Sequence, residues 1–333
     1  MREVVKMKDI VVFALTSSIA LADEICVHLG IKRGEISVKH FADGEIIVEP
    51  LESVRGKHVF LVQSTCNPVS ETLMEVLIAL DACKRASADK VTVVMPYYGY
   101  ARQDRKARAR QPITAKLVAD LLQSAGADRV VTLDLHAPQI QGFFNIPTDD
   151  LTAVSMLGQY FRTKKFKDEV VVVSPDHGGA TRARNLADTL PGSTIAIIDK
   201  RRTKPNVAEA MNLIGDVNGK IAIIIDDIVD TGGSLLGGVD MLYRNGAKEV
   251  YCACSHGILS GNAVERIHNS SIKELVVTNS IPLNDEKKAE PKIRQISIGY
   301  MLAKTIQAIQ LHTPVSEMYN MFNDKSKENS TVR

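Results

Sequence analysis

The residues best suited to chemistry in this sequence lie in one segment, 221–234. It begins with an unbroken apolar run, continues with the adjacent carboxylates Asp226 and Asp227, and ends in a loop of small residues before a helical pattern. Glycines allow positive φ and close backbone approach, so the loop amides can point at one phosphate from a helix N-terminus. Carboxylates repel a phosphate, but they accept hydrogen bonds from sugar hydroxyls. The segment therefore predicts a sugar-phosphate site with the phosphate at residues 230–234.

A structural interpretation of the same segment is an acidic turn that caps a helix through Thr231 or Ser234. It accounts for the loop, but it leaves an aspartate pair beside a buried strand without a reason. We therefore favour the sugar-phosphate site, since longer motifs match by chance less often than short ones.

A strongly basic stretch follows another apolar run. Between residues 102 and 110 it carries five cations and one acidic residue, a local charge of +4: Arg102, Arg105, Lys106, Arg108, Arg110 and Asp104. Such a concentration of charge suits a polyphosphate. Nucleic acid and an ordinary solvated loop are the alternatives, because basic runs are permissive signals.

Polar residues also follow three other apolar runs. His136 and Asp176 each end a predicted strand, and the carboxyl ends of parallel strands are where α/β proteins bind ligands. Magnesium prefers oxygen ligands and substrate phosphates, so Asp176 is a natural ligand and His136 a less natural one. Lys200 and Arg202 follow the run 194–198 and lead into a polar stretch typical of a mobile loop. That loop is either a catalytic lid or an ordinary solvated basic segment.

The elements that must position these residues are short and apolar. Eight runs have the composition of strands buried on both faces: 59–62, 91–95, 129–133, 170–173, 194–198, 221–225, 250–254 and 275–277. Helical patterns lie between many of them, at 71–86, 112–124, 180–190 and 235–245. Alternating strands and helices favour parallel sheets built by crossover connections, and hence an α/β protein. Pro112 suits a first helical turn, and Gly126 and Gly246 suit helix stops.

A weak internal repeat predicts two similarly folded halves. The pattern Gly-Ala-x-x-Val occurs at 126–130 and again at 246–250, and each copy leads into a strand that ends with a histidine. The alternative is that this pattern marks any junction from helix to strand. The chain length of 333 residues also favours about two domains, at roughly 150 residues each.

Composition excludes several classes of protein. Hydrophobic residues make up 45% and charged residues 24%, so the chain is neither a disordered tail nor a coiled coil. A net charge of +2 favours neither nucleic acid nor a membrane as partner. The N-terminal apolar run is interrupted by Asp9 and by the hydroxyl residues 16–18, so we expect no secretory signal and no membrane span. Five cysteines without framework spacing indicate reduced thiols and a cytoplasmic location.

Several segments, taken in order along the chain, resemble one enzyme family. These segments are 41–45, 63–66, 96–105, 134–137, 174–179, 199–202 and 221–234. Together they are similar to the ribose-phosphate diphosphokinases, also called phosphoribosyl diphosphate synthetases, from about Asp9 to Met321. The resemblance implies an α/β fold of two tandem phosphoribosyltransferase-like domains, each a mainly parallel sheet flanked by helices.

The resemblance also implies a division of labour between the domains. We expect an N-terminal domain at 1–155 with ATP-binding loops and oligomer contacts, and a C-terminal domain at 156–315 with the ribose 5-phosphate loop and the catalytic loop. A tail at 316–333 should end in disorder. Members of the family are usually homohexamers built from dimers, so self-association is expected.

The resemblance assigns roles to individual residues. It implies that ATP is bound by Phe41, Asp43, Gly44, Glu45, Arg102 and Gln103. It implies that ribose 5-phosphate is bound by Arg202, Asp226, Asp227, Asp230, Thr231, Gly232, Gly233 and Ser234. It makes Lys200 and Arg202 catalytic, closing over the β- and γ-phosphates, and makes His136 and Asp176 ligands of Mg²⁺.

The implied reaction converts ATP and ribose 5-phosphate into 5-phosphoribosyl 1-diphosphate and AMP, and so serves nucleotide biosynthesis. Two alternatives stay open: a phosphoribosyltransferase that consumes phosphoribosyl diphosphate, and a non-catalytic regulatory partner of a synthetase. His177 departs from the small or aliphatic residue that the family usually has there. Ser53, Arg55 and Ser316 resemble regulatory phosphate positions, but Pro314 stands where a hydroxyl is common, which leaves control by phosphate and ADP in doubt.

Overall fold

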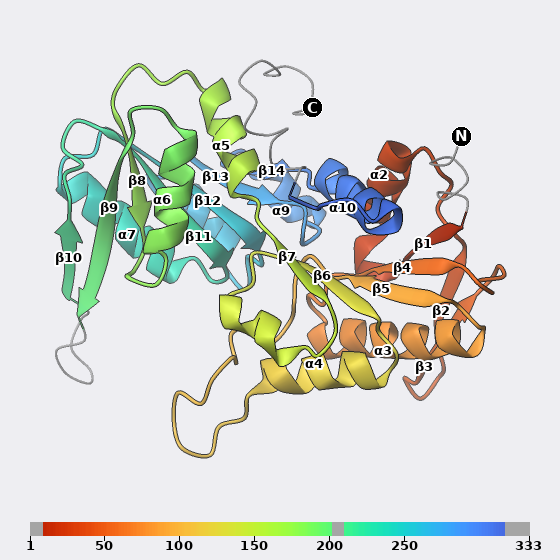
Figure 1. Ribbon diagram of the computed structural model, residues 1–333. Helices are drawn as coiled ribbons and strands as arrows, with labels where there is room; N and C mark the ends of the chain where they lie inside the picture. Colours follow the sequence, from red (N-terminus) through yellow and green to blue (C-terminus); the bar gives the residue numbers. More distant parts are fainter. Residues whose placement is uncertain (1–8, 202–209, 317–333) are drawn as a thin grey trace. The chain divides into compact units, whose positions relative to one another are not determined.

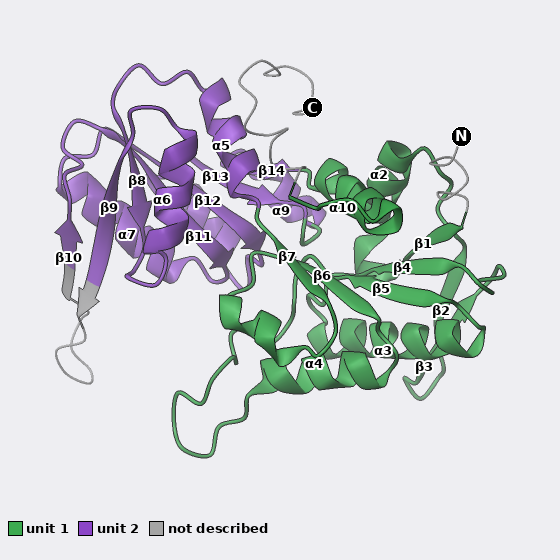
Figure 2. Ribbon diagram, viewed as in Figure 1, with its two compact units in different colours: residues 1–152, 280–282, 297–318 green, residues 153–279, 283–296, 319–333 purple. Residues whose placement is uncertain are grey.

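The structure is a computed structural model that describes residues 9–201 and 210–316. Within these residues the chain forms two compact units (Figure 2). Unit 1 comprises residues 9–152, 280–282 and 297–316, and unit 2 comprises residues 153–201, 210–279 and 283–296. Each unit is an α/β layer structure, which confirms the fold class predicted from the alternation of strands and helices.

Unit 1 is built on a five-stranded parallel sheet of order β1-β4-β5-β6-β7. Figure 1 shows α3 and α4 along one face of the sheet and α2 and α10 along the other. A small antiparallel hairpin, β2-β3, stands beside it. The elements are β1 (Ile10–Ala14), η1 (Thr16–Ser18), α2 (Ile19–Leu29), β2 (Ile36–His40), β3 (Ile46–Pro50), β4 (His58–Val62), α3 (Val69–Arg85), β5 (Lys90–Val94), α4 (Thr114–Ser124), β6 (Arg129–Leu133), η2 (Pro138–Phe143), β7 (Thr148–Leu151) and α10 (Gly299–Leu311).

Unit 2 contains a seven-stranded sheet of order β10-β9-β8-β11-β12-β13-β14, parallel except for the antiparallel edge strand β10. Helices cover both faces of the sheet, as the apolar strands require. The elements are α5 (Val154–Thr163), β8 (Val170–Ser174), α6 (Ala180–Thr189), β9 (Thr194–Arg201), β10 (Ala210–Ile214), β11 (Ile221–Val229), α7 (Gly233–Arg244), β12 (Glu249–Gly257), α8 (Ala263–Asn269), β13 (Glu274–Thr278), α9 (Asp285–Ala289) and β14 (Ile293–Ile296).

The internal repeat corresponds to equivalent elements of the two units. The paired strands β5 and β6 of unit 1 have their counterparts in the paired strands β11 and β12 of unit 2. Gly126 and Gly246 precede β6 and β12 with φ of +108° and +87°, values at which glycine escapes the steric cost of a Cβ. The repeat therefore marks a shared helix-to-strand turn as well as a shared sheet.

Two local expectations differ from the structure. Helix α4 begins at Thr114, so Pro112 precedes the helix instead of lying in its first turn. The expected second domain, 156–315, loses residues 280–282 and 297–315 to unit 1. Helix α10 belongs to unit 1 because it packs against α2, and its Met301 and Ile306 side chains are buried. In addition, Gln310 Oε1 lies 3.0 Å from Nδ1 of His58 on β4.

Candidate active site

The predicted phosphate loop connects β11 to α7 in unit 2. Gly232 has φ of +75°, the left-handed conformation, and α7 begins at the next residue. Glycine is the N-cap residue, so the N-cap position itself supplies no side chain to cap the helix. Ser234 and Thr231 are exposed beside it. A helix N-terminus of this kind attracts an anion through its free amides and its partial positive charge.

The two carboxylates before this loop lie at the carboxyl end of β11, held by one arginine. Arg182 of α6 places Nη1 at 3.5 Å from Asp226 Oδ1 and at 3.3 Å from Asp227 Oδ1. The Asp227 amide also donates to Asp226 Oδ1 at 2.9 Å. The Asp226 side chain is 31% exposed and that of Asp227 is 7% exposed, so Asp226 offers more of its surface to a ligand.

Electrostatics make this pair unusual. Burial raises the pKa of Asp226 above its ordinary value, and the neighbouring Asp227 raises it further, while Arg182 opposes the shift. Two adjacent carboxylates near one guanidinium repel each other, and hydrogen bonds donated by hydroxyls would stabilise their charge. The pair is therefore suited to accept hydrogen bonds from a polyol.

Arg182 was not foreseen from the sequence. It lies 45 and 44 residues before the aspartates it contacts, inside a helical pattern that contains other basic residues. No local signal distinguishes it from Arg184, because only the packing of α6 beside β11 decides which side chain faces the pair.

The expected metal ligands lie in different units, each just beyond a strand. His136 follows β6 in unit 1 and Asp176 follows β8 in unit 2, and both side chains are exposed. Asp176 Oδ1 accepts the Gly179 amide at 2.9 Å, which fixes the carboxylate at the start of α6. In residues 9–201 and 210–316, no three His, Cys, Asp or Glu side chains gather as a ready-made metal site.

Asp176 fits Mg²⁺ better than His136 does. Mg²⁺ takes oxygen ligands and is commonly held by one or two carboxylates together with substrate phosphates. Asp176 supplies such an oxygen, whereas imidazole suits softer ions. His177 points elsewhere, since its Nε2 lies 3.0 Å from Oδ1 of Asp199 on β9. The residue that departs from the family pattern is thus tied to the strand that carries Lys200.

The expected ATP-binding residues occupy two exposed turns of unit 1. Phe41 lies in the β2-β3 turn with 55% of its surface exposed, and Asp43 Oδ1 accepts the Glu45 amide at 3.1 Å. Gly44 completes this turn with φ of +93°. An exposed ring beside carboxylates is able to meet a flat heterocycle.

The second turn follows β5. Arg102 and Gln103 are exposed there, and Gln103 is anchored because its Oε1 accepts a hydrogen bond from Thr114 Oγ1 at 2.5 Å while its carbonyl accepts one from the Ala115 amide.

The two expected catalytic residues belong to the segment at the end of β9. Lys200 lies in β9, paired in register with Met211 of β10, and Arg202 lies outside the described residues.

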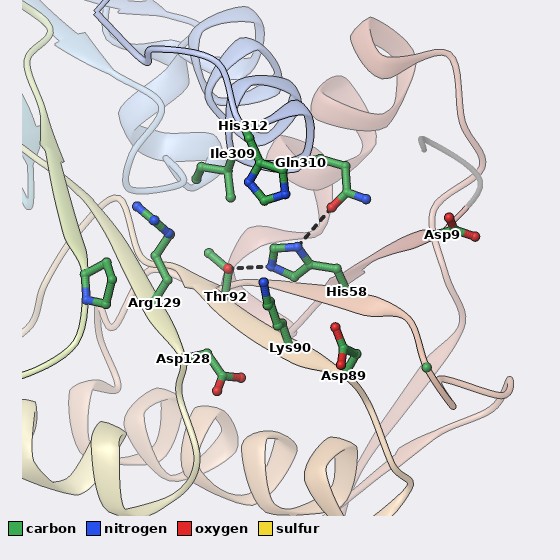
Figure 3. A pocket seen from close by; sticks show the side chains of 12 residues that line it. Asp9, His58, Asp89, Lys90, Thr92, Asp128, Arg129, Ile309, Gln310 and His312 are labelled. Carbon is green, nitrogen blue, oxygen red and sulfur yellow. Dashed lines mark hydrogen bonds between the residues drawn. The ribbon is translucent and has the colours of Figure 1, made fainter. Parts of the chain in front are cut away.

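A cavity of about 440 Å³ lies at the other end of the unit 1 sheet (Figure 3). Its lining includes His58, Lys90 and Arg129, the first residues of β4, β5 and β6. Burial lowers the pKa of His58, whose ring is held between Thr92 and Gln310 at 2.8 and 3.0 Å. Amino ends of parallel strands lie opposite the carboxyl ends, so this cavity is separate from the predicted site.

Comparison with known proteins decides the family. Residues 10–126 match the N-terminal domain of ribose phosphate pyrophosphokinase, and residues 200–320 match the phosphoribosyl synthetase-associated domain. The ribose-phosphate pyrophosphokinase of Bacillus subtilis (strain 168) is 56% identical over 313 residues, covering 94% of this chain and 98% of that protein. The chain belongs to the ribose-phosphate pyrophosphokinase family. Pyrophosphokinase and diphosphokinase are two words for the same activity, so the sequence resemblance is confirmed.

Other members of the family support the same assignment. The ribose-phosphate pyrophosphokinase of Bacillus caldolyticus is 58% identical over 308 residues, or 92% of this chain and 97% of that protein. The crystal structure of phosphoribosylpyrophosphate synthetase from Mycobacterium smegmatis matches with a TM-score of 0.87 and 42% identity, covering 91% of this chain and 99% of that one. The chain is therefore an enzyme of the transferase and kinase class that serves nucleotide biosynthesis. In its described residues, no helix has the length and apolar character to cross a membrane.

The Asp226 carboxyl generates a prediction about stability and pH. Its pKa is raised by folding, so the folded chain binds more protons than the unfolded chain, and stability falls as the pH rises above the ordinary aspartate pKa of about 3.9. Asp226→Asn removes this titration and keeps an oxygen for the Asp227 amide. We expect the variant to be more stable than the parent at pH 8, by roughly 1 kcal/mol or more, with little difference at low pH. Urea denaturation at several pH values measures this.

A matched control is Asp188→Asn on α6, an exposed carboxylate that forms no ion pair with any residue that the structure describes. It should leave the pH dependence of the free energy of unfolding unchanged. Equal curves for Asp226→Asn and the parent would contradict the raised pKa of Asp226.

Proposed function

We propose that the carboxyl end of β11 and the following loop bind ribose 5-phosphate, to which the enzyme transfers the diphosphoryl group of ATP. The products are 5-phosphoribosyl 1-diphosphate and AMP. The observation that carries this proposal is the junction of an aspartate pair with a glycine-initiated helix, because one face offers acceptors for hydroxyls and the next offers donors for a phosphate.

In this proposal the sugar phosphate is held at both ends. The 5-phosphate lies against Asp230, Thr231, Gly232, Gly233 and Ser234, whose backbone turns into α7. Asp226 and Asp227 accept hydrogen bonds from the ribose hydroxyls, and Arg182 keeps the two carboxylates from repelling each other. Because both ends of the sugar phosphate are held, its anomeric hydroxyl has one orientation. Binding thereby aligns this hydroxyl, which is the nucleophile, for the transfer.

The ATP site in this proposal uses the two exposed turns of unit 1. Phe41 stacks on the adenine, while Asp43, Gly44 and Glu45 hold the nucleotide from the β2-β3 turn. Arg102 and Gln103 bind the phosphates from the turn after β5. The local charge of +4 in residues 102–110 favours a polyphosphate over a neutral ligand.

Transfer proceeds in line at the β-phosphorus, with the anomeric oxygen attacking and AMP leaving. Lys200 and Arg202 stabilise the negative charge that develops on the transferred group, and no covalent nucleophile on the protein is needed. His136 and Asp176 are the residues that would hold Mg²⁺, of which Asp176 is the better chemical match. When bound, Mg²⁺ neutralises phosphate charge and orients the groups.

The reaction itself is the first test. Purified protein incubated with ATP, ribose 5-phosphate and Mg²⁺ should form AMP and 5-phosphoribosyl 1-diphosphate in equal amounts. Phosphorus NMR measures the formation of both products. Omitting either substrate, or chelating the metal with EDTA, should abolish both products, and excess Mg²⁺ should restore them. Absence of turnover while ribose 5-phosphate still binds would instead support the regulatory-partner alternative.

Lys200 provides a second test. Lys200→Ala should lower kcat by roughly a hundredfold or more, the effect of losing one preorganised charge-stabilising donor, while ribose 5-phosphate still binds. Lys248→Ala is the matched control in the same unit. The Lys248 side chain is 55% exposed, and among the described residues its ion-pair partner is Asp168. A turnover number for Lys200→Ala equal to that of Lys248→Ala would exclude the catalytic role.

The enzyme is also proposed to be a homohexamer built from dimers. Ile113 at the N-cap of α4 and Leu117 and Leu121 within the helix recur every four residues and are 37%, 55% and 38% exposed, which gives this end of unit 1 an exposed apolar stripe. Light scattering should give six times the 36.4 kDa of one chain. Leu117→Glu should lower that mass if α4 contributes to the assembly. A single-chain mass for the parent would refute the hexamer.

A cytoplasmic location is proposed from the thiols. All five cysteines are buried and none forms a disulfide, as expected in a reducing compartment. Cell fractionation should place the activity in the cytosolic fraction, and recovery from the membrane or the medium would oppose this assignment.

A further inference from the structure

Arg266 of α8 lies against the phosphate loop, although no motif pointed to it. Helix α8 is fixed from below by Ala263 and Ile267, both fully buried in the core of unit 2. Arg266 lies on the exposed side of the same helix. From there its Nη1 donates a hydrogen bond to the carbonyl of Thr231 at 3.3 Å.

This bond is the last of a series of hydrogen bonds that hold the carbonyls of residues 229–231 toward α8 and the segment before it. The segment that connects β12 to α8 bonds the two preceding carbonyls through its backbone: Ile258 and Leu259 donate to Val229 at 2.9 and 3.1 Å, and Ser260 donates to Asp230 at 3.1 Å. These bonds fix the approach of the chain to the loop. The last of them comes from Ser260, three residues before α8 begins at Ala263.

The Thr231 carbonyl is therefore bonded by a side chain where its predecessors are bonded by backbone. The next carbonyl, of Gly232, accepts the Leu236 amide at 2.9 Å inside α7. In a trans peptide the C=O and the following N–H point in opposite directions. Holding the Thr231 carbonyl toward α8 consequently aims the Gly232 amide away from α8.

The charge of Arg266 acts at the same place. Its Nη1 lies only 3.6 Å from the position that a Cβ on Gly233 would occupy, so the guanidinium stands at the N-terminus of α7. Asp240 and Glu265 line the same shallow hollow of about 390 Å³. Within the described part of unit 2, Arg266 forms an ion pair with neither of them, and its guanidinium bonds the loop at Thr231.

We propose that Arg266 is a positioning residue of the ribose 5-phosphate site, orienting the Thr231–Gly232 peptide so that its amide faces the phosphate. This inference rests on the proposed function of the loop. Arg266 is not a catalytic residue, since its contact is with the carbonyl of Thr231. Its removal therefore affects binding of the phosphorylated sugar and not the transfer step.

A pair of substitutions separates the hydrogen bond from the bulk of the side chain. Arg266→Met keeps a long stem without a donor, and Arg266→Lys keeps a donor with nearly the same reach. We expect Arg266→Met to raise KM for ribose 5-phosphate about tenfold, with kcat and KM for ATP within twofold of the parent. Arg266→Lys should return KM for ribose 5-phosphate to within about threefold of the parent value.

Arg244→Ala is the control, because that arginine is exposed in the last turn of α7, at the end of the helix away from the loop. It should leave both KM values unchanged. A KM for ribose 5-phosphate in Arg266→Met within twofold of the parent would overturn the proposal. So would an equal rise in KM for ATP, or no recovery in Arg266→Lys, since either result indicates a general disturbance.

Calorimetric titration with ribose 5-phosphate tests the role of Arg266 separately from the proposed diphosphoryl transfer. Weaker binding in Arg266→Met supports the positioning role even if the parent shows no turnover, in which case the proposed reaction alone fails. Unchanged binding in Arg266→Met beside normal turnover overturns the role of Arg266 alone.

Discussion

The direction in which peptide groups point between β11 and α7 is the constraint on which the rest of the site depends. A buried parallel strand must satisfy its backbone groups within the sheet, and β11 does so with β8 and β12 on its two sides. Beyond Val229 the carbonyls remain bonded on the side of the β12–α8 connection. The chain then turns into α7, and the positive φ of Gly232 permits this turn.

The aspartate pair carries an electrostatic cost within the fold. Burial raises the pKa of Asp226 because a charged carboxylate loses water that the protein does not replace in full. Arg182 offsets part of that loss by lying near both carboxylates. Sites of this kind are where local stability is commonly sacrificed to function.

The two units share an architecture but carry different residues at the carboxyl ends of their strands. Unit 2 has Asp226, Asp227 and a loop that turns into a helix. In unit 1 the strand that corresponds to β11 is β5, and it is followed by the turn that carries Arg102 and Gln103 and not by a pair of adjacent aspartates. The repeat of sheet topology is therefore not accompanied by a repeat of the aspartate pair.

The sequence by itself determined the strands, most helices and the loop that turns into α7, because apolar periodicity and glycine placement are properties of consecutive residues. It also carried the family resemblance through motifs in order along the chain. The tertiary structure alone decided that Arg182 lies between the aspartates, that Arg266 bonds Thr231, and that α10 joins unit 1. Each of these contacts joins residues at least 35 positions apart in the sequence. The packing of helices on the sheets decides which residues meet, and no local sequence pattern indicates these partners.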